Sequence, residues 1–216
     1  MQLIRRQPAP SGPEDGFTLI ELVLSVAILG IVSVALCGVV LQYLQTSVDT
    51  SARLNESTDE QFISTYWQND VSSLGRRSRS ASSLDVAQSV FVGAAGPGGC
   101  GSTAGSVVVA FAWNQFRAGA ANPDEAWSTT PQEVAYVTVP KGGRLVLERV
   151  RCRDGVASAP LAVAHNLTTT PTISCDTSCT ASTPPNRVSM TFTVKDADNA
   201  RSSGYTTTVS ADRRQS

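Results

Sequence analysis

The feature that most constrains this chain is an almost wholly apolar run from Phe17 to Leu41, close to the N-terminus. Glu21 is the only charged residue in this run, and the next charge along the chain is Asp49. About 20 apolar residues in helical form cross a hydrocarbon core of ~30 Å. The run is therefore long enough to span a membrane as a single helix.

The basic residues near the N-terminus indicate which way this helix would face. Arg5 and Arg6 precede the apolar run, and they are the only basic residues before it. Cationic residues stay preferentially on the cytoplasmic side of a membrane helix. We therefore expect a single-pass inner-membrane (cytoplasmic-membrane) protein whose N-terminus is cytoplasmic and whose chain beyond Leu41 lies outside.

Four cysteines lie far downstream, at Cys100, Cys152, Cys175 and Cys179. Their even number suits two disulfides in an oxidising compartment, in agreement with an outside location. A zinc site is less favoured, because zinc ligands usually come in close pairs with histidine nearby and His165 is the only histidine. Three pairings are possible; we favour Cys100 with Cys152 and Cys175 with Cys179, and the sequence does not exclude the other two.

The helix is expected to continue beyond the membrane. Residues 42–77 contain no proline, and Gly75 is their only glycine. Apolar residues recur at helical spacings on one stripe, which we expect to pack on a globular domain: Phe62, Ile63, Tyr66, Trp67, Val71 and Leu74. We predict an amphipathic helix over residues 45–80, which ends in the region of Gly75 and the Arg- and Ser-rich run 76–83.

The rest of the chain has the pattern of strands, with alternating or β-branched segments between turn residues. The candidates are Val86–Val92, Ser106–Trp113, Glu133–Val139, Leu145–Arg151, Leu161–His165, Arg187–Val194 and Tyr205–Ser210. Lys141-Gly142-Gly143 predicts a hairpin, residues 196–199 another reversal, and residues 93–105 a Gly-rich loop. The fold class that follows is α+β, a long N-terminal helix packed on an antiparallel β-sheet domain.

One short motif lies at the start of the apolar run, after a short charged leader: Gly16-Phe17-Thr18-Leu19-Ile20-Glu21-Leu22. It closely resembles the processing site of type IV pilins and type II secretion pseudopilins. The resemblance implies the pilin fold, cleavage between Gly16 and Phe17 by a prepilin peptidase, and N-methylation of Phe17. It divides the chain into a leader over residues 1–16, a transmembrane assembly helix over 17–44, the amphipathic helix over 45–80 and a β-rich domain over 81–216.

Glu21 is the residue to which the resemblance gives an assembly role. A carboxylate inside a membrane helix is costly and needs a partner. Cleavage after Gly16 creates a positive α-amine at Phe17, and in the family's filament the glutamate of one subunit neutralises the amine of a neighbour. The helix macrodipole also favours a negative charge near the helix start.

Three other interpretations of the apolar run fit the sequence less well. An ordinary secretory signal has an apolar core of about 7–15 residues and a small-residue cleavage site, and this run is longer. A lipoprotein signal at Cys37 would need a small residue before the cysteine, whereas Leu36 is large. A plain signal anchor leaves the heptapeptide around Glu21 unexplained.

The chain downstream of the motif is most similar to minor pilins of the J or W type, in the stretch from Tyr66 to Val71 and in several strand candidates. That similarity implies a priming or tip subunit of a type IV pilus or a type II secretion-like filament. The implied partners are other pilin or pseudopilin subunits and the inner-membrane assembly platform. The alternative is a membrane-anchored extracytoplasmic binding module that does not polymerise.

No catalytic constellation is recognisable, and we expect neither an enzyme nor a cofactor or metal. His165 stands alone, and the Gly-rich segment 93–105 lacks the Gly-Lys-Ser/Thr ending of a phosphate loop. Asp196, Asp198 and Asn199 lack the glycine and distal glutamate of an EF-hand loop. The 17 Lys and Arg residues nearly balance the 18 Asp and Glu residues, which argues against a nucleic-acid binder.

Overall fold

The computed structural model describes residues 16–79, 84–128, 130–196 and 204–214. The chain divides into two compact units, Met1–Val48 and Asp49–Ser216. A single helix, α1 (Leu19–Ser72), contributes residues to both of them. Of the predicted leader only Gly16 is described, and Asp198 and Asn199 of the predicted reversal lie outside the described residues.

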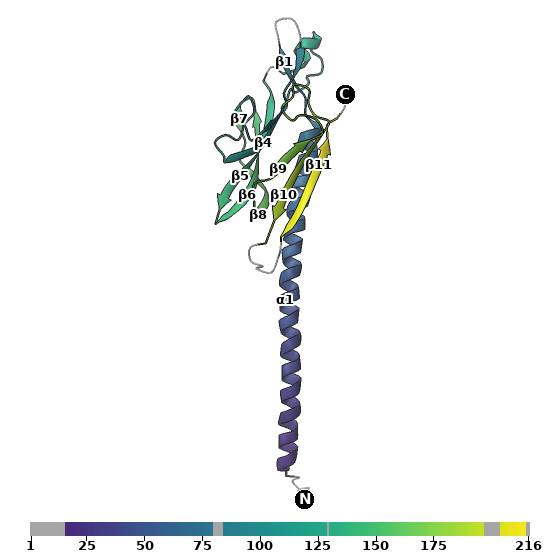
Figure 1. Ribbon diagram of the computed structural model, residues 1–216, viewed down its shortest axis with the longest axis vertical. Coiled ribbons are helices and arrows are strands. Elements are labelled where there is room, and N and C mark those ends of the chain that lie inside the picture. Colours follow the sequence, from purple (N-terminus) through teal and green to yellow (C-terminus); the bar gives the residue numbers. More distant parts are fainter. Residues whose placement is uncertain (1–15, 80–83, 129, 197–203, 215–216) are drawn as a thin grey trace, which may run out of the picture. The chain divides into compact units, whose positions relative to one another are not determined.

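The second unit is built on antiparallel β-structure (Figure 1). Within the described residues a nine-stranded sheet has the order β11-β10-β8-β6-β5-β4-β3, with β7 beside β6 and β9 beside β10, and β1 and β2 form a separate pair. The strands are β1 (Arg76–Arg79), β2 (Leu84–Ala87), β3 (Val90–Val92), β4 (Ser106–Trp113), β5 (Gln132–Lys141), β6 (Arg144–Arg153), β7 (Val156–Ala157), β8 (Leu161–Leu167), β9 (Thr172–Cys175), β10 (Arg187–Val194) and β11 (Tyr205–Asp212), and a short 3-10 helix spans Pro123–Ala126. The predicted fold class, a long N-terminal helix packed on an antiparallel sheet, is confirmed.

Most of the strand predictions agree with the structure, and the hairpin at Gly142-Gly143 is confirmed. These two glycines have φ values of 58° and 79° between β5 and β6. Two successive residues with positive φ are typical of the tight hairpin turn that matches strand twist. The short strands β1, β7 and β9 were not predicted, because two to four residues carry almost no periodic signal.

The predicted strand Val86–Val92 is wrong as one element, since the chain breaks between β2 and β3. Ser89 causes the break: its side chain is fully buried, and its hydroxyl donates to the carbonyl of Ala87 at 3.1 Å. A short polar side chain that bonds to nearby backbone competes with regular strand pairing.

The predicted end of the amphipathic helix, residue 80, is also wrong, because α1 ends at Ser72. Gly75 has φ +152°, and the Arg76 N–H donates to the Ser89 hydroxyl at 2.8 Å. The Arg77 N–H donates to the Asn114 side-chain oxygen at 2.6 Å, and residues 76–79 form β1. The backbone N–H groups of residues 76 and 77 thus bond to side chains from distant segments, and the chain does not continue as a helix.

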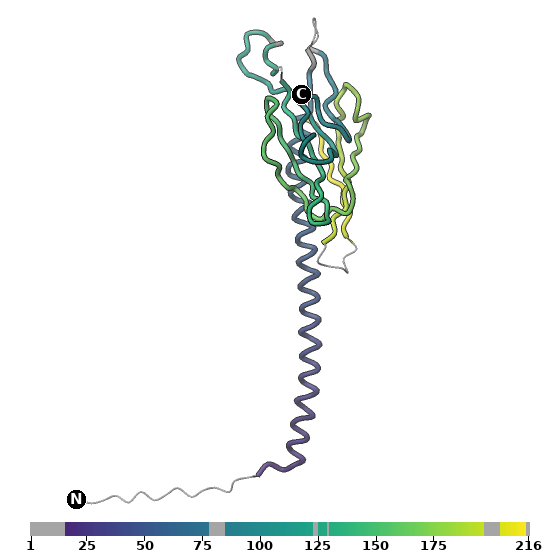
Figure 2. The backbone as a smooth tube through the Cα atoms, turned by 90° about the vertical axis from the view of Figure 1, so that its left-hand side faces the viewer, coloured from purple at the N-terminus to yellow at the C-terminus, as the bar shows by residue number. Residues whose placement is uncertain are grey.

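The β1–β2 pair and the loop between β4 and β5 lie at the same end of the second unit in both views (Figures 1 and 2). They touch through side chains, since the Arg77 guanidinium lies 4.8 Å from the centre of the Trp127 ring. This contact between a cation and an aromatic face fixes the loop to the chain that follows α1.

The apolar stripe of α1 packs against the sheet. Ile63, Trp67 and Val71 are buried, and so is Leu74 just beyond the helix, whereas Phe62 is 51% exposed and does not belong to the buried stripe. The Trp67 ring meets Phe111 and Tyr136 edge to face, with centroids 5.1 and 5.3 Å away. Such pairs add about 0.5–1.5 kcal/mol beyond the area that they bury.

A buried ion pair fixes the same helical turns to the middle of the sheet. The Asp70 carboxylate is 4% exposed and accepts two hydrogen bonds from the Arg149 guanidinium, at 2.7 and 2.6 Å. The Tyr136 hydroxyl donates to the same carboxylate at 2.7 Å. The Tyr66 ring lies 5.1 Å from the guanidinium, so both partners of the ion pair are enclosed.

This arrangement shifts the pKa of two of its members. Burial raises the pKa of Tyr136 well above its usual value, and the negative charge of Asp70 adds to the rise. Burial alone would lower the pKa of Arg149, but its hydrogen bonds and attraction to Asp70 outweigh that effect and raise it. The folded protein therefore keeps the Tyr136 phenol neutral beyond the pH at which an exposed phenol ionises.

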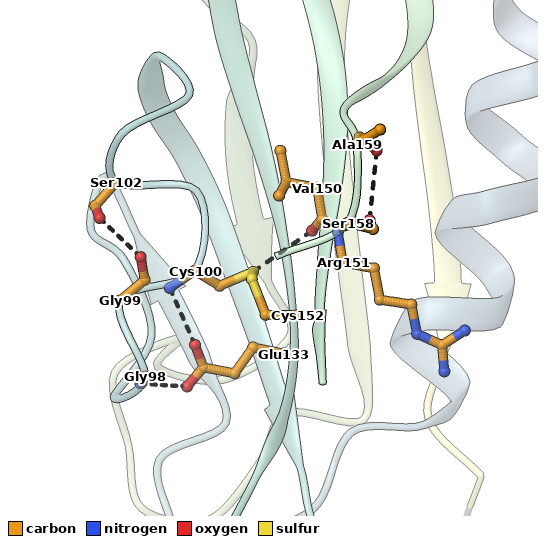
Figure 3. The surroundings of a disulfide bond; sticks show 10 residues. All are labelled: Gly98, Gly99, Cys100, Ser102, Glu133, Val150, Arg151, Cys152, Ser158 and Ala159. Atoms are coloured by element: carbon orange, nitrogen blue, oxygen red, sulfur yellow. Dashed lines mark hydrogen bonds between the residues drawn. A yellow bond between two sulfur atoms is a disulfide. The ribbon is translucent and has the colours of Figure 1, made fainter. Parts of the chain in front are cut away.

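Two disulfides are present, Cys100–Cys152 and Cys175–Cys179, and these are the pairs favoured from the sequence. The first ties the Gly-rich loop to β6 (Figure 3). In the same place the buried Glu133 carboxylate accepts hydrogen bonds from the backbone N–H groups of Gly98 and Cys100, at 2.6 and 3.2 Å. A Cβ on Gly96 would lie 2.9 Å from this carboxyl group, so the glycines fold the loop around a carboxylate of the chain itself.

We predict that Asp70→Asn lowers the free energy of unfolding by about 3–5 kcal/mol, because it leaves the Arg149 charge buried without a counter-charge. The measurement is urea unfolding of the full chain in detergent micelles, followed by tryptophan fluorescence. The matched control is Asp212→Asn, which breaks the exposed ion pair with Arg187 and should change stability little. Equal losses in the two variants would contradict the structural role of Asp70.

Tyr136→Phe should cost about 0.5–1.5 kcal/mol near neutral pH, the usual worth of one hydrogen bond. Above the ordinary tyrosine pKa of about 10, the unfolded chain releases the phenol proton and the folded chain retains it, so wild-type stability falls. The stability difference between wild type and Tyr136→Phe should therefore shrink between about pH 8 and about pH 11. A constant difference across this range, measured by the same urea unfolding, would refute the raised pKa.

Candidate processing and assembly site

The start of α1 is organised by Thr18. Its carbonyl accepts hydrogen bonds from the N–H groups of Glu21 and Leu22, at 3.1 and 3.2 Å, and its hydroxyl lies 3.4 Å from the Glu21 nitrogen. Thr18 thus caps the helix, because it satisfies donors that have no partner inside the first turn. Gly16 and Phe17 precede the cap and are exposed, so the peptide bond between them is accessible.

Glu21 lies in the first turn of α1 and is exposed. Its negative charge is close to the positive end of the helix macrodipole, which stabilises it. The described part of this unit, residues 16–48, contains no lysine or arginine. No cationic side chain within that segment can therefore neutralise the Glu21 carboxylate.

All side chains of residues 16–48 are exposed, and most of them are apolar. Among the described residues α1 is one helix that is long and apolar enough to cross a membrane. Covering a large apolar side chain is worth about 1.5–3 kcal/mol, so this surface strongly favours lipid or other helices over water. Gly30 and Gly38 have open space around them, which allows another backbone to approach closely.

Residues 13–36 match the family model described as the prokaryotic N-terminal methylation motif. The chain carries this motif. The matched segment includes Gly16, Phe17 and Glu21, and it supports a type IV pilin-like protein whose precursor is cleaved and methylated. No curated protein and no solved structure matches the chain.

Of the three residues predicted for processing and assembly, Gly16 and Phe17 precede α1, and Glu21 lies in its first turn. The four paired cysteines belong to the other unit. His165, which stands alone in the sequence, is an exposed residue of β8 tied to α1. Its N–H donates to the Asp59 carboxylate at 2.7 Å, and its ring nitrogen lies 3.2 Å from the other carboxylate oxygen.

The sequence did not reveal that Asp70, Tyr136 and Arg149 meet. One signal was present, because Asp70 lies three residues after Trp67 and therefore falls on the buried stripe of α1. A charged residue on a buried stripe requires a partner of opposite charge. Which arginine would supply it depends on strand order, and that order is not visible in a single sequence.

Proposed function

We propose that this chain is the precursor of a minor pilin or pseudopilin, processed after Gly16, N-methylated at Phe17, and assembled through its N-terminal helix into a type IV pilus or type II secretion-like filament. The observation that carries the proposal is the match of residues 13–36 to the methylation motif. The exposed apolar surface of α1 supports it, because a filament or a membrane would cover that surface.

Cleavage would change the charge at the helix start. Before cleavage the Phe17 nitrogen is a neutral amide, and afterwards it is a positive α-amine one helical turn from Glu21. The α-amine of a neighbouring subunit can then pair with Glu21, whose own segment offers no cationic side chain. An unpaired carboxylate is expensive in an apolar environment, so this pairing would fix the register of one helix against the next.

The remaining parts of the chain follow from this assignment. The leader over residues 1–16 and the helix over residues 17–44 would hold the precursor in the inner membrane, with the N-terminus in the cytoplasm. The partners would be the prepilin peptidase, other pilin or pseudopilin subunits and the inner-membrane assembly platform. The motif belongs to structural subunits, and the proposal includes no catalysis by this chain.

The role as a priming or tip subunit rests on the similarity of the Tyr66–Val71 stretch and of several strands to minor pilins of the J or W type. In the structure this stretch has a clear role in packing. Trp67 and Asp70 are the residues that fix α1 to the sheet, through the aromatic contacts and the ion pair with Arg149. These contacts lie wholly within the second unit, where they join the last turns of α1 to the sheet.

Processing is tested by mass spectrometry of the N-terminal peptide in the native host. We expect a peptide that begins at Phe17 and carries one added methyl group. Gly16→Arg should keep the leader on, because a large charged side chain obstructs the backbone that glycine leaves open. Efficient cleavage of Gly16→Arg would rule out Gly16 as the processing site. An intact Met1 leader in the wild type, in cells with active peptidase, would indicate a membrane anchor that does not polymerise.

Assembly is tested with Glu21→Ala, which should be cleaved normally but enter sheared filaments at least about tenfold less, because the α-amine of its neighbour loses the charge that neutralises it. Ser25→Ala is the matched control. It lies one turn further along α1, and its hydroxyl bonds only to the Glu21 carbonyl at 2.7 Å. Incorporation of Glu21→Ala at the level of Ser25→Ala would refute the register mechanism.

A further inference from the structure

Strand β6 carries three arginines at alternating positions, Arg149, Arg151 and Arg153. Alternate residues of a strand project from the same face of the sheet. Arg149 shows that this is the face on which α1 packs, since it pairs with Asp70 of the helix. Figure 3 shows the Arg151 side chain pointing away from Cys152, which belongs to the opposite face.

Of these three arginines, only Arg149 is paired with a carboxylate of the residues that the structure describes. Asp70 satisfies Arg149 with two hydrogen bonds. The Arg151 guanidinium lies 5.9 Å from the centre of the Trp113 ring, and its Nε is buried without a hydrogen-bond partner. Arg153 is exposed. Among the described residues, no ion pair to a carboxylate is found for either Arg151 or Arg153.

The surroundings of Arg151 disfavour its charge. Burial lowers its pKa, and the positive charges of Arg153 and Arg149 lower it further. The attraction of Asp70 opposes these effects without outweighing them. A cation that is partly removed from water and repelled by its neighbours gains most from an added anion.

There is space for such an anion beside the two arginines. Arg151, Arg153, Val156, Ala157 and Ser158 line a hollow of ≈ 450 Å³. The hollow is formed because β7 folds back on β6 and sets Val156 opposite Arg153. The residues that line it are therefore two arginines together with small and apolar residues.

We propose that Arg151 and Arg153 form an anion-binding site that takes carboxylates from an acidic segment of a partner protein. A guanidinium presents a fork of N–H donors that matches the two oxygens of a carboxylate. Val156 and Ala157 offer apolar surface to the aliphatic part of a polypeptide. Phosphate sites typically add a helix N-terminus or a concave group of backbone N–H donors, and the lining of this hollow comes from β6, β7 and Ser158.

The site goes beyond the proposed function, because it lies wholly within the second unit and needs neither cleavage at Gly16 nor pairing of Glu21. A partner could bind there before, during or after assembly. If the anion-binding site failed in a binding experiment, the assembly proposal would be unaffected. Conversely, a chain that never polymerises could still bind a partner at this site.

The test uses the purified full chain in detergent micelles, titrated at low salt with a synthetic tetraglutamate peptide. Binding is followed by fluorescence, because Trp113 lies beside Arg151, and Trp113→Phe identifies that signal. Arg151→Gln should weaken binding at least about tenfold, since it removes charge-assisted hydrogen bonds. Arg153→Gln should weaken it about two- to fivefold, as expected for an exposed charge.

The controls separate the site from general attraction. Arg117→Gln removes the same charge from an exposed residue of the β4–β5 loop and should leave binding unchanged, and a tetraglutamine peptide should not bind. If Arg151→Gln fails to fold, as judged by circular dichroism, the exposed Arg153→Gln still decides. Equal binding by all arginine variants, or none by wild type, would overturn the proposal. Tighter binding of a single-stranded oligonucleotide, lost in Arg153→Gln, would also overturn it in favour of a phosphate-backbone site.

Discussion

The carboxylate of Asp70 is the point on which the second unit depends. Removing a charge from water is costly, and only the paired guanidinium of Arg149 and the hydroxyl of Tyr136 make its burial acceptable. Because these donors come from β5 and β6, in the middle of the sheet, the contact specifies both the rotation of α1 and its position along the strands. Apolar packing around Trp67 also stabilises the contact between helix and sheet. Because apolar contacts are not directional, they distinguish alternative positions of the helix along the strands less strictly than the ion pair does.

Another carboxylate on the same helix, that of Glu21, differs from Asp70 in both burial and pairing. Glu21 is exposed within a segment that has no basic side chain, and around it the surface is apolar. In one part of α1 the charge is satisfied inside the fold, and in the other it has no partner within its segment. The methylation motif is found at the second of these places, which agrees with a helix whose first half is completed by assembly.

The sequence was sufficient for features that depend on local chemistry. The apolar run, the tight Gly142-Gly143 turn and the long strands each have a periodic or conformational signature within a few residues. Gly75 indicated the end of α1 to within three residues, but strand β1 was missed, because Ser89 and Asn114 lie far from Arg76 and Arg77 in the chain and accept their N–H groups only in the folded state. The ion pair of Asp70 was missed for the same reason: the separation from Arg149 is 79 residues. Long-range polar partners leave almost no mark on a single sequence.

The Glu133 carboxylate has a consequence for how the first disulfide can form. Glu133 lies directly opposite Cys152 in the pairing of β5 with β6, and it accepts the backbone N–H of Cys100. This non-covalent contact thus joins the Gly-rich loop to β5, beside Cys152 of β6, without the help of the sulfur atoms. When an external disulfide oxidant forms a mixed disulfide with one of the two cysteines, the thiolate of the other attacks it at a high effective concentration and releases the reduced oxidant as a thiol. The disulfide then forms between cysteines that hydrogen bonds to Glu133 have already placed close together.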